Sequence, residues 1–170
     1  MNSSTPEEHR ADAPVAVRCV VITVSDTRTE ETDTGGQTAI NKLTEAGHTI
    51  VERYIIRDEP VPMRALLVEL RERADVDAIL MTGGTGLSGR DQTYETVSEL
   101  ISKPLPGYGE LFRMLSYREI GAAAMLSRAA GGLLDRTLLL TMPGSRAAVR
   151  LALDDVILPE LPHLVREARR

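Results

Sequence analysis

Two segments of this chain are apolar along almost their whole length, and this restricts the folds open to it. Residues 16–24 (AVRCVVITV) are rich in β-branched side chains, and residues 76–82 (VDAILMT) have the same apolar character. A strand with this pattern has no polar face, so both of its faces must be buried. A parallel sheet covered by helices on both sides provides that environment. The two segments therefore predict central strands of such a sheet.

Helical patterns alternate with these strands. Residues 34–47 predict a helix that is capped by Asp33 or Thr34 and ended by Gly47. Residues 48–56 indicate a strand with one wetter face, residues 61–74 an amphipathic helix, and residues 92–101 a further helix. This order is typical of right-handed crossovers in a doubly wound sheet. We expect an α/β fold of three layers, with a mostly parallel central sheet and helices on both faces.

The second half of the chain is less regular. Residues 103–110 (KPLPGYGE) indicate a loop and residues 110–120 a helix. Residues 129–143 predict two short strands around Asp135 and Arg136, and residues 145–168 a closing helix bent at Pro159 or Pro162. With 170 residues the chain suits one domain, which we place at residues 15–170. Residues 1–14 are polar and contain prolines, so we expect a flexible tail there.

Composition narrows the class of protein. About 42% of the residues are apolar and 26% are charged, as in a globular protein, and the net charge of −5 disfavours a general nucleic-acid coat. Cys19, the one cysteine, excludes an intrachain disulfide, and its place in an apolar run indicates a buried core residue. No stretch approaches the roughly 18 continuous apolar residues of a membrane span, and no secretory signal is present, so we expect a cytoplasmic protein without a membrane partner.

Polar residues follow four of the predicted strands. An open parallel sheet binds ligands beyond the carboxyl ends of its strands, so these residues are the candidate site. They are Ser25, Asp26, Thr27 and Arg28; Arg57, Asp58 and Glu59; Thr82, Gly83, Gly84, Thr85 and Gly86, with Arg90 and Asp91 beyond; and Pro143, Gly144, Ser145 and Arg146. The convergence of acids, arginines, hydroxyls and glycines on one rim is the main functional signal.

The glycine-rich turn after the strand at 76–82 suits a phosphate group. Such a turn exposes backbone N–H groups at the positive end of a helix, and acids beside it commonly act through a divalent cation that bridges carboxylate and phosphate. A structural alternative stays open for each part. The glycines could make only a tight turn, Asp91 could cap the next helix, and Asp58 could be a turn residue before Pro60.

Other site types find little support. No lysine occurs in residues 83–91, so the P-loop signature fails. The spacing G-x-G-x-x-G occurs at Gly84, Gly86 and Gly89, but it is not in the first strand-helix unit and no acid ends a strand about 20 residues later. A dinucleotide oxidoreductase is therefore disfavoured. None of the histidines, at positions 9, 48 and 163, falls on the predicted rim, which leaves a Ser-His-Asp hydrolase or a histidine-bound metal without support.

Five motifs in order carry a family resemblance. They are VSDTRTEETDTGG, TGGTGLSGRD, PGYGELFRMLS, AMLSRAAGG and TMPGS, and together they span nearly the whole chain after the tail. This set resembles the MoaB/Mog family of molybdenum cofactor biosynthesis proteins, and its MoaB branch in particular. The resemblance implies a trimer, or a hexamer of two trimers, and a Mg²⁺-dependent reaction in which ATP adenylates molybdopterin and pyrophosphate is released. It also implies a possible handover to the protein that inserts molybdate.

The resemblance also implies roles for particular residues. Asp58 and Asp91 correspond to the two aspartates that the transfer needs, and we expect them to hold Mg²⁺. Residues 82–86 correspond to the pocket floor, and Ser116 and Ser127, with Arg128 beside them, to residues that hold the pterin and its phosphate. Two alternatives stay open: a carrier that binds molybdopterin without catalysis, and an oligomeric scaffold. Leu111, Phe112 and Leu115, on a predicted helix, give a weak hint of an oligomer contact.

Overall fold

The computed structural model describes residues 16–170 of the chain. The predicted tail of residues 1–14 lies outside the described residues. The strands are β1 (Arg18–Val24), β2 (Thr49–Ile56), β3 (Ala78–Thr82), β4 (Lys103–Pro104), β5 (Gly131–Leu134) and β6 (Thr137–Met142). The helices are α2 (Thr34–Glu45), α3 (Pro60–Arg71), α4 (Thr93–Leu100), α5 (Pro106–Ile120), the 3₁₀ segment η1 (Gly121–Leu126), α6 (Arg146–Leu151), the π-helical segment η2 (Ala152–Ile157) and α7 (Leu161–Ala168).

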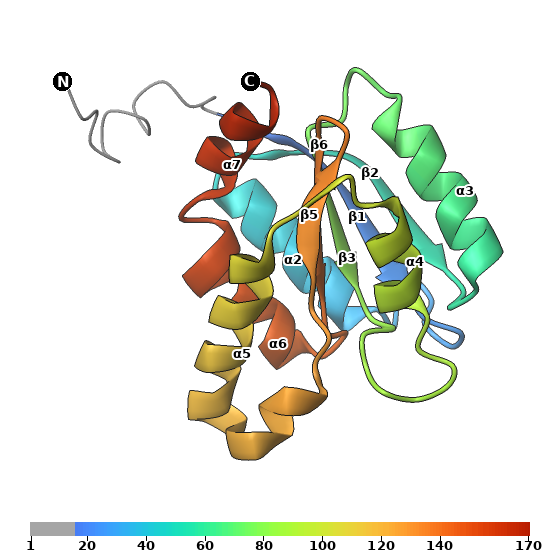
Figure 1. Ribbon diagram of the computed structural model, residues 1–170, viewed down its shortest axis with the longest axis vertical. Helices are drawn as coiled ribbons and strands as arrows, with labels where there is room; N and C mark the ends of the chain where they lie inside the picture. The colour runs from blue at the N-terminus through green and yellow to red at the C-terminus, as the bar shows by residue number, and fades with distance from the viewer. Residues whose placement is uncertain (1–15) are drawn as a thin grey trace, which may run out of the picture.

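The strands form one sheet in the order β2-β1-β3-β6-β5-β4. β2, β1, β3 and β6 are parallel, whereas β5 is antiparallel to β6 and β4 is antiparallel to β5. Helices cover both faces of this sheet (Figure 1). The predicted three-layer α/β fold with a mostly parallel sheet is therefore confirmed. None of the helices in the described part of the chain has the length and apolar character needed to span a bilayer.

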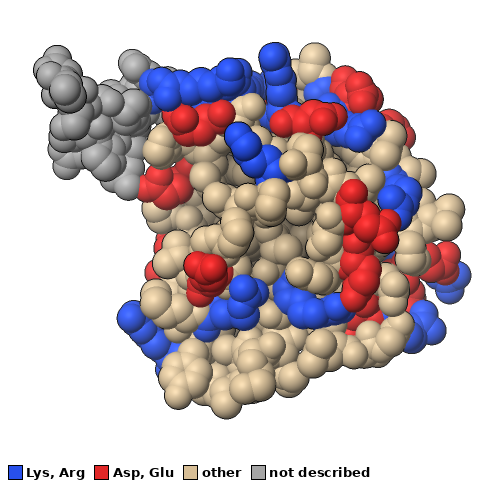
Figure 2. All heavy atoms as spheres, in the orientation of Figure 1, with Lys and Arg blue, Asp and Glu red and all other residues tan. Residues whose placement is uncertain are grey.

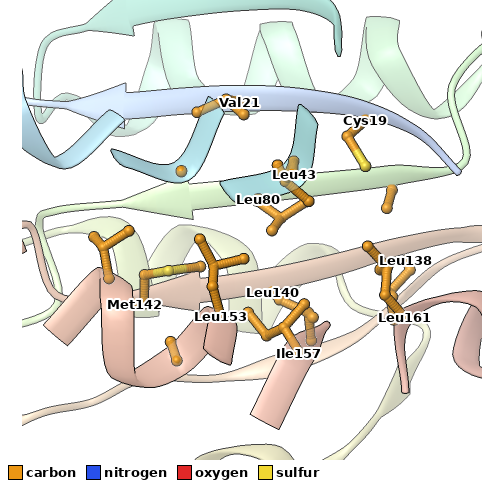
Figure 3. Close-up of a cluster of buried hydrophobic side chains, with 14 of the residues drawn as sticks. Cys19, Val21, Leu43, Leu80, Leu138, Leu140, Met142, Leu153, Ile157 and Leu161 are labelled. Carbon is orange, nitrogen blue, oxygen red and sulfur yellow. The ribbon is translucent and has the colours of Figure 1, made fainter. Parts of the chain in front are cut away.

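The side chains of β1 alternate between two separate hydrophobic cores. Cys19 and Val21 point to the core under α2, α5, α6, η2 and α7, part of which is shown in Figure 3. Val20 and Ile22 point to the opposite core, under α3 and α4. Both cores require apolar residues, and this explains why every position of β1 except Arg18 and Thr23 is apolar. Cys19 is fully buried, as expected from its sequence context.

Local capping agrees with several sequence predictions. Asp33, and not Thr34, caps α2, because its Oδ1 accepts a hydrogen bond of 2.8 Å from the backbone N–H of Gly36. Gly47 follows the end of α2 with a φ of 85°, a conformation that glycine adopts at little cost. The hairpin between β5 and β6 turns at Asp135, which has a φ of 54°.

Two predictions for the second half need revision. Residues 103–110 were expected to form a loop, but Lys103 pairs with Leu133 in β4 and α5 begins at Pro106. Proline suits the first turn of a helix because the missing N–H has no partner there in any case. The predicted closing helix is not one bent helix but three separate segments. After α6 the chain continues as the π-helical segment η2, and α7 begins at Leu161 after a turn that contains Pro159.

The sheet has a switch point between β1 and β3. The chain passes from β1 to its neighbour β2 on one side, and then to β3 on the other side of β1. Ligands of open α/β sheets bind beyond the carboxyl ends of the strands at such a point. The carboxyl ends of β1, β2, β3 and β6 meet at this edge, where Val24 pairs with Ile56, Thr23 with Thr82, and Thr82 with Met142.

Candidate functional site

The turn after β3 needs glycine at two positions. Gly83 has a φ of 99° and Gly84 a φ of 64°. A Cβ at Gly83 would collide with the carbonyl oxygen of Val24, and a Cβ at Gly84 would lie 2.6 Å from Asp58 Oδ2. The backbone N–H of Gly83 donates to the carbonyl oxygen of Met142 at 2.9 Å, which joins the ends of β3 and β6. The turn is therefore tight, as the structural alternative supposed.

The same turn also presents hydrogen-bond donors. In the part of the chain that the structure describes, no oxygen accepts a hydrogen bond from the backbone N–H groups of Gly84, Thr85 and Gly86. The carbonyl oxygen of Gly84, by contrast, accepts one from the N–H of Thr93 at 3.1 Å, at the start of α4. These residues lie ahead of α4, which begins at Thr93, so the N–H groups belong to a turn and not, as the sequence suggested, to the end of a helix. Consecutive N–H groups in such a turn form a concave site suited to an anionic oxygen. The tight turn and the anion cradle are thus compatible interpretations.

The two predicted catalytic aspartates lie on either side of this turn. Asp58, in the loop after β2, accepts a hydrogen bond from the backbone N–H of Gln92 through Oδ1 at 3.0 Å. Asp91 Oδ2 accepts one from the N–H of Ser88 at 2.8 Å, and a Cβ at Gly86 would lie 2.9 Å from the same oxygen. Asp91 does not cap α4, whose N-cap is Gln92. The structural alternative for Asp91 is therefore wrong.

A third aspartate and an arginine complete the cluster. Asp26, in the loop after β1, forms an ion pair with Arg90, and its Oδ1 accepts a weak hydrogen bond of 3.4 Å from the N–H of Asp58. Burial raises the pKa of Asp58, and the nearby carboxylates of Asp91 and Asp26 raise it further, while the N–H of Gln92 and the charge of Arg90 oppose the rise. The cluster therefore disfavours negative charge on Asp58 and would gain from a cation.

The carboxylates fit a Mg²⁺ ion that keeps other ligands. Within residues 16–170, no group of three or more His, Cys, Asp or Glu side chains is arranged to hold a metal by itself. Mg²⁺ usually binds through one or two carboxylates, keeps several waters and takes substrate phosphate oxygens. Asp58 and Asp91 offer such a partial oxygen set beside the N–H groups of the glycine turn. This donor chemistry fits Mg²⁺ bound together with a phosphate.

A cavity of about 350 Å³ opens beside the turn. Nine of the residues predicted for the site line it: Gly84, Thr85, Gly86, Asp91, Ser116, Ser127, Pro143, Gly144 and Ser145. Sequence analysis missed its apolar wall, which α5, η1 and α6 provide: Phe112, Ile120, Ala123, Ala124, Leu126 and Ala148. The run of small residues at 122–124 was the available signal, because small side chains leave room beside a loop. The cavity joins a polar floor to an apolar wall.

A larger cavity of about 610 Å³ adjoins the first at Ser127, which lines both. Tyr94 of α4, Glu110 and Arg113 of α5, and Arg128 in the loop between η1 and β5 are among the residues that line it. Figure 2 shows the surface in the view of Figure 1, where both basic and acidic side chains surround a hollow of uncharged residues.

The remaining predicted residues lie around the smaller cavity rather than in its lining. Asp26, Asp58 and Arg90 form the charged cluster described above. Thr82 is buried and its hydroxyl donates to the carbonyl oxygen of Pro143 at 3.3 Å. Ser25 Oγ accepts hydrogen bonds from the N–H groups of Thr27 and Arg28 and so shapes its own loop. Gly83 is enclosed by the strand ends, and Arg128 binds the glycine loop.

The histidines of the described chain lie away from this edge. His48 directly precedes β2, and its Nδ1 accepts a hydrogen bond of 3.3 Å from the N–H of Val17, while His163 is on α7 beside Glu160. The expectation that neither residue lies on the rim is confirmed.

Comparison with known proteins gives a consistent result. The family model described as "Probable molybdopterin binding domain" matches residues 20–163. The chain is 50% identical over 164 residues to "Molybdenum cofactor biosynthesis protein B" of Bacillus anthracis, covering 96% of this chain and 97% of that protein.

Solved structures agree. A crystal structure of "Molybdenum cofactor biosynthesis protein B" superposes with a TM-score of 0.89 at 49% identity, covering 94% of this chain and 99% of that one. The "tungsten cofactor synthesizing protein MoaB" of Pyrococcus furiosus superposes with a TM-score of 0.82 at 34% identity, covering 93% of this chain and 100% of that one.

Proposed function

Because this chain belongs to the MoaB/Mog family of molybdenum cofactor biosynthesis proteins, we propose that it is a nucleotidyltransferase that adenylates molybdopterin with ATP. ATP and molybdopterin are its substrates and Mg²⁺ its cofactor. The products are adenylylated molybdopterin, for a downstream molybdate-insertion protein, and pyrophosphate. Location in the cytoplasm is part of this proposal.

One observation carries the proposal. Asp58 and Asp91 come from the loops after two different strands. Asp58 lies against Gly84 and Asp91 against Gly86, beside a cavity with an apolar wall. A tight turn needs neither carboxylate, and a purely hydrophobic pocket needs no cluster of acids that raises the pKa of Asp58. A phosphate group bound with a divalent cation uses both features.

The proposed reaction makes use of this arrangement. A terminal phosphate oxygen of molybdopterin attacks the α-phosphorus of ATP, a new P–O bond forms, and the bond from the α-phosphorus to the bridging oxygen of pyrophosphate breaks. The N–H groups of Thr85 and Gly86 would hold phosphate oxygens, and Asp58 and Asp91 would hold the Mg²⁺, which would supply neutralisation of the phosphate charge. No histidine base is needed, because a phosphate monoester is already ionised near neutral pH. Ser116 and Ser127 line the cavity that receives the pterin.

An oligomer is the second part of the proposal, as a trimer or a hexamer of two trimers. Of the three residues in the sequence hint, Phe112 is buried in the core and Leu115 packs against it, whereas Leu111 is exposed. Other exposed apolar residues lie on the same helix, α5, and on η1: Met114, Tyr117, Ile120, Met125 and Leu126. The lower end of the molecule, where α5 meets η1, is largely free of charge in Figure 2. This surface suits burial against a second copy.

Pyrophosphate release tests the proposed reaction. It is measured with ATP and Mg²⁺, with and without molybdopterin, for the wild type and for Asp91→Asn. Asp75→Asn is the matched control, because Asp75 is an exposed aspartate that pairs with Arg73 before β3, at the other end of the sheet. We expect release that depends on molybdopterin and collapses only in Asp91→Asn. If wild type and Asp91→Asn both bind the pterin but neither releases pyrophosphate, the protein is a carrier or a scaffold.

A further inference from the structure

Arg128 is bound to the glycine loop by most of its donor groups. Its Nε donates to the carbonyl oxygen of Gly86 at 2.8 Å, and one terminal nitrogen donates to the carbonyl oxygen of Asp91 at 3.1 Å. The other terminal nitrogen pairs with Glu95 on α4. The backbone N–H of Arg128 adds a bond of 3.0 Å to the carbonyl oxygen of Thr85. Arg128 therefore binds three backbone carbonyl oxygens of the segment from 85 to 91, at Thr85, Gly86 and Asp91.

The environment of the guanidinium fixes it in this position. Its carbon lies 5.2 Å from the centroid of the Tyr94 ring, a distance at which the cation is attracted to the ring face. The side chain is 20% exposed, and the hydrogen bond from Arg128 lowers the pKa of Glu95. Each of its three nitrogens thus has a partner within the protein. Three of its five N–H groups are thereby engaged within the protein, and the carboxylate of Glu95 already balances its charge, which makes the guanidinium a weaker partner for an anionic substrate.

We propose that Arg128 is a positioning residue that clamps the loop of residues 83–92 and thereby holds Asp91 and the N–H groups of Thr85 and Gly86 in place. This differs from the direct role in substrate binding that the sequence predicts for it. The planar fork of an arginine can reach two carbonyl oxygens and a carboxylate at once, whereas the ammonium of a lysine is a compact charge. The kinetic consequence rests on the proposed adenylation, but the effect on the loop does not.

The clamp predicts which amide groups depend on Arg128. Within the loop, Ser88 N–H donates to Asp91, Asp91 N–H donates to the carbonyl oxygen of Ser88 at 2.9 Å, and Gln92 N–H donates to Asp58. These bonds open together if the carbonyl oxygens of Gly86 and Asp91 are released. Amide hydrogen exchange at Ser88, Asp91 and Gln92 therefore reports on the clamp without any substrate.

The experiment compares Arg128→Ala and Arg128→Lys with wild type. Arg64→Ala is the matched control, because Arg64 on α3 pairs with Glu99 of α4 without touching the loop. We expect exchange at the three amides to quicken by about tenfold or more in Arg128→Ala, and less in Arg128→Lys. Turnover should fall by about tenfold or more with little change in the KM values, and guanidinium ion at a non-denaturing concentration should restore part of it. Arg64→Ala should match wild type.

Each outcome decides something. If the loop exchanges at the wild-type rate in both Arg128 variants, or if KM for ATP or molybdopterin rises while turnover is kept, Arg128 binds substrate directly and the clamp is refuted. If wild type releases no pyrophosphate but exchange still quickens in the variants, the clamp stands and the proposed adenylation fails. Should Arg128→Ala not fold, as judged by circular dichroism, Arg128→Lys alone decides through the same exchange measurement.

Discussion

Asp58 Oδ1 accepts a hydrogen bond of 3.0 Å from the backbone N–H of Gln92, which joins the loop after β2 to the start of α4. This bond places the carboxylate near those of Asp91 and Asp26 and removes part of it from water. Bringing like charges together in a half-buried place costs stability. The arrangement favours the binding of a cation, and it lowers the stability of the protein when no cation is bound.

Replacement of Asp58 by asparagine should raise the melting temperature at pH 7. Asparagine keeps an oxygen that accepts from Gln92 but carries no charge, so we expect a rise on the order of a degree or two. Burial and the neighbouring carboxylates raise the pKa of Asp58, so wild-type stability falls as pH rises from the unfolded value of about 3.9 through the raised pKa. The advantage of asparagine must therefore vanish at acid pH, where Asp58 is protonated.

The effect of Mg²⁺ on the melting temperature provides a control for Asp58→Asn. Mg²⁺ should raise the melting temperature of the wild type more than that of Asp58→Asn, because a ligand that binds the folded state stabilises it. Asp58→Ala, which also removes the acceptor for Gln92, should be less stable than Asp58→Asn. A lower melting temperature for Asp58→Asn than for wild type at pH 7 would show that repulsion among the three carboxylates is not the controlling effect.

Asp77 should have the opposite pH dependence. It lies before β3, is almost fully buried, and binds the backbone N–H and the guanidinium of Arg18, with Arg169 of the C-terminal end also paired to it. Burial raises the pKa of Asp77, but the bonds from Arg18 and the charge of Arg169 outweigh this, so the pKa lies below its usual value. Its contribution to stability is complete above about pH 4 and is lost as pH falls through the lowered pKa.

Asp77→Asn therefore destabilises the protein at pH 7. The loss should be about 1–3 kcal/mol, because the charged hydrogen bonds to Asp77 are weakened while Arg18 and Arg169 stay partly in water. The difference between variant and wild type should shrink below pH 4. Urea unfolding at pH 7 and at pH 3 measures both quantities, with the exposed Asp75→Asn as a control that changes little at either pH. Equal losses at both pH values would contradict an electrostatic origin.

Gly84 should tolerate no side chain. Its φ of 64° disfavours other residues, and a Cβ there would press on Thr93 and lie 2.6 Å from Asp58 Oδ2. Gly84→Ala should cost about 1–3 kcal/mol of stability and most of the activity, because Asp58 must move. Gly89→Ala is the matched control in the same loop, since a Cβ there meets nothing within 4 Å. Equal activity in the two variants would show that the close approach of Asp58 to the turn is unimportant.

The sequence predicted the sheet and its carboxyl edge well because both follow from local patterns. The apolar run of residues 16–24 could be satisfied only between two helical layers, and the strand ends then had to share an edge. The region from 103 to 110 was misjudged because Pro104 and Pro106 favour a loop and the first turn of a helix equally. Here the pairing of Lys103 with Leu133, a contact distant in sequence, decided the outcome.

The sequence predicted the polar residues of the candidate site but not the apolar residues of its wall. The residues that line the cavity from the strand ends were found because they follow strands, whereas Phe112, Ile120 and Leu126 come from α5 and η1. Whether a helix faces a cavity depends on how it packs, and the helical pattern does not reveal this. Arg128 shows the same limit. Its motif indicated a ligand contact, but its three nitrogens all have partners within the protein.

The exposed apolar surface of α5 should control assembly if the proposed oligomer forms. Met114 and Tyr117 are 47% and 63% exposed, lie one turn apart on α5 and line neither cavity. Their joint replacement by glutamate should shift the protein from trimer or hexamer to monomer at micromolar concentration, because charges would be buried unpaired in the contact. Val61→Glu is the control, since Val61 is 79% exposed on α3, on the opposite face of the sheet. Sedimentation velocity decides: a wild-type monomer, or an unchanged oligomer in the double variant, would exclude this surface as the contact.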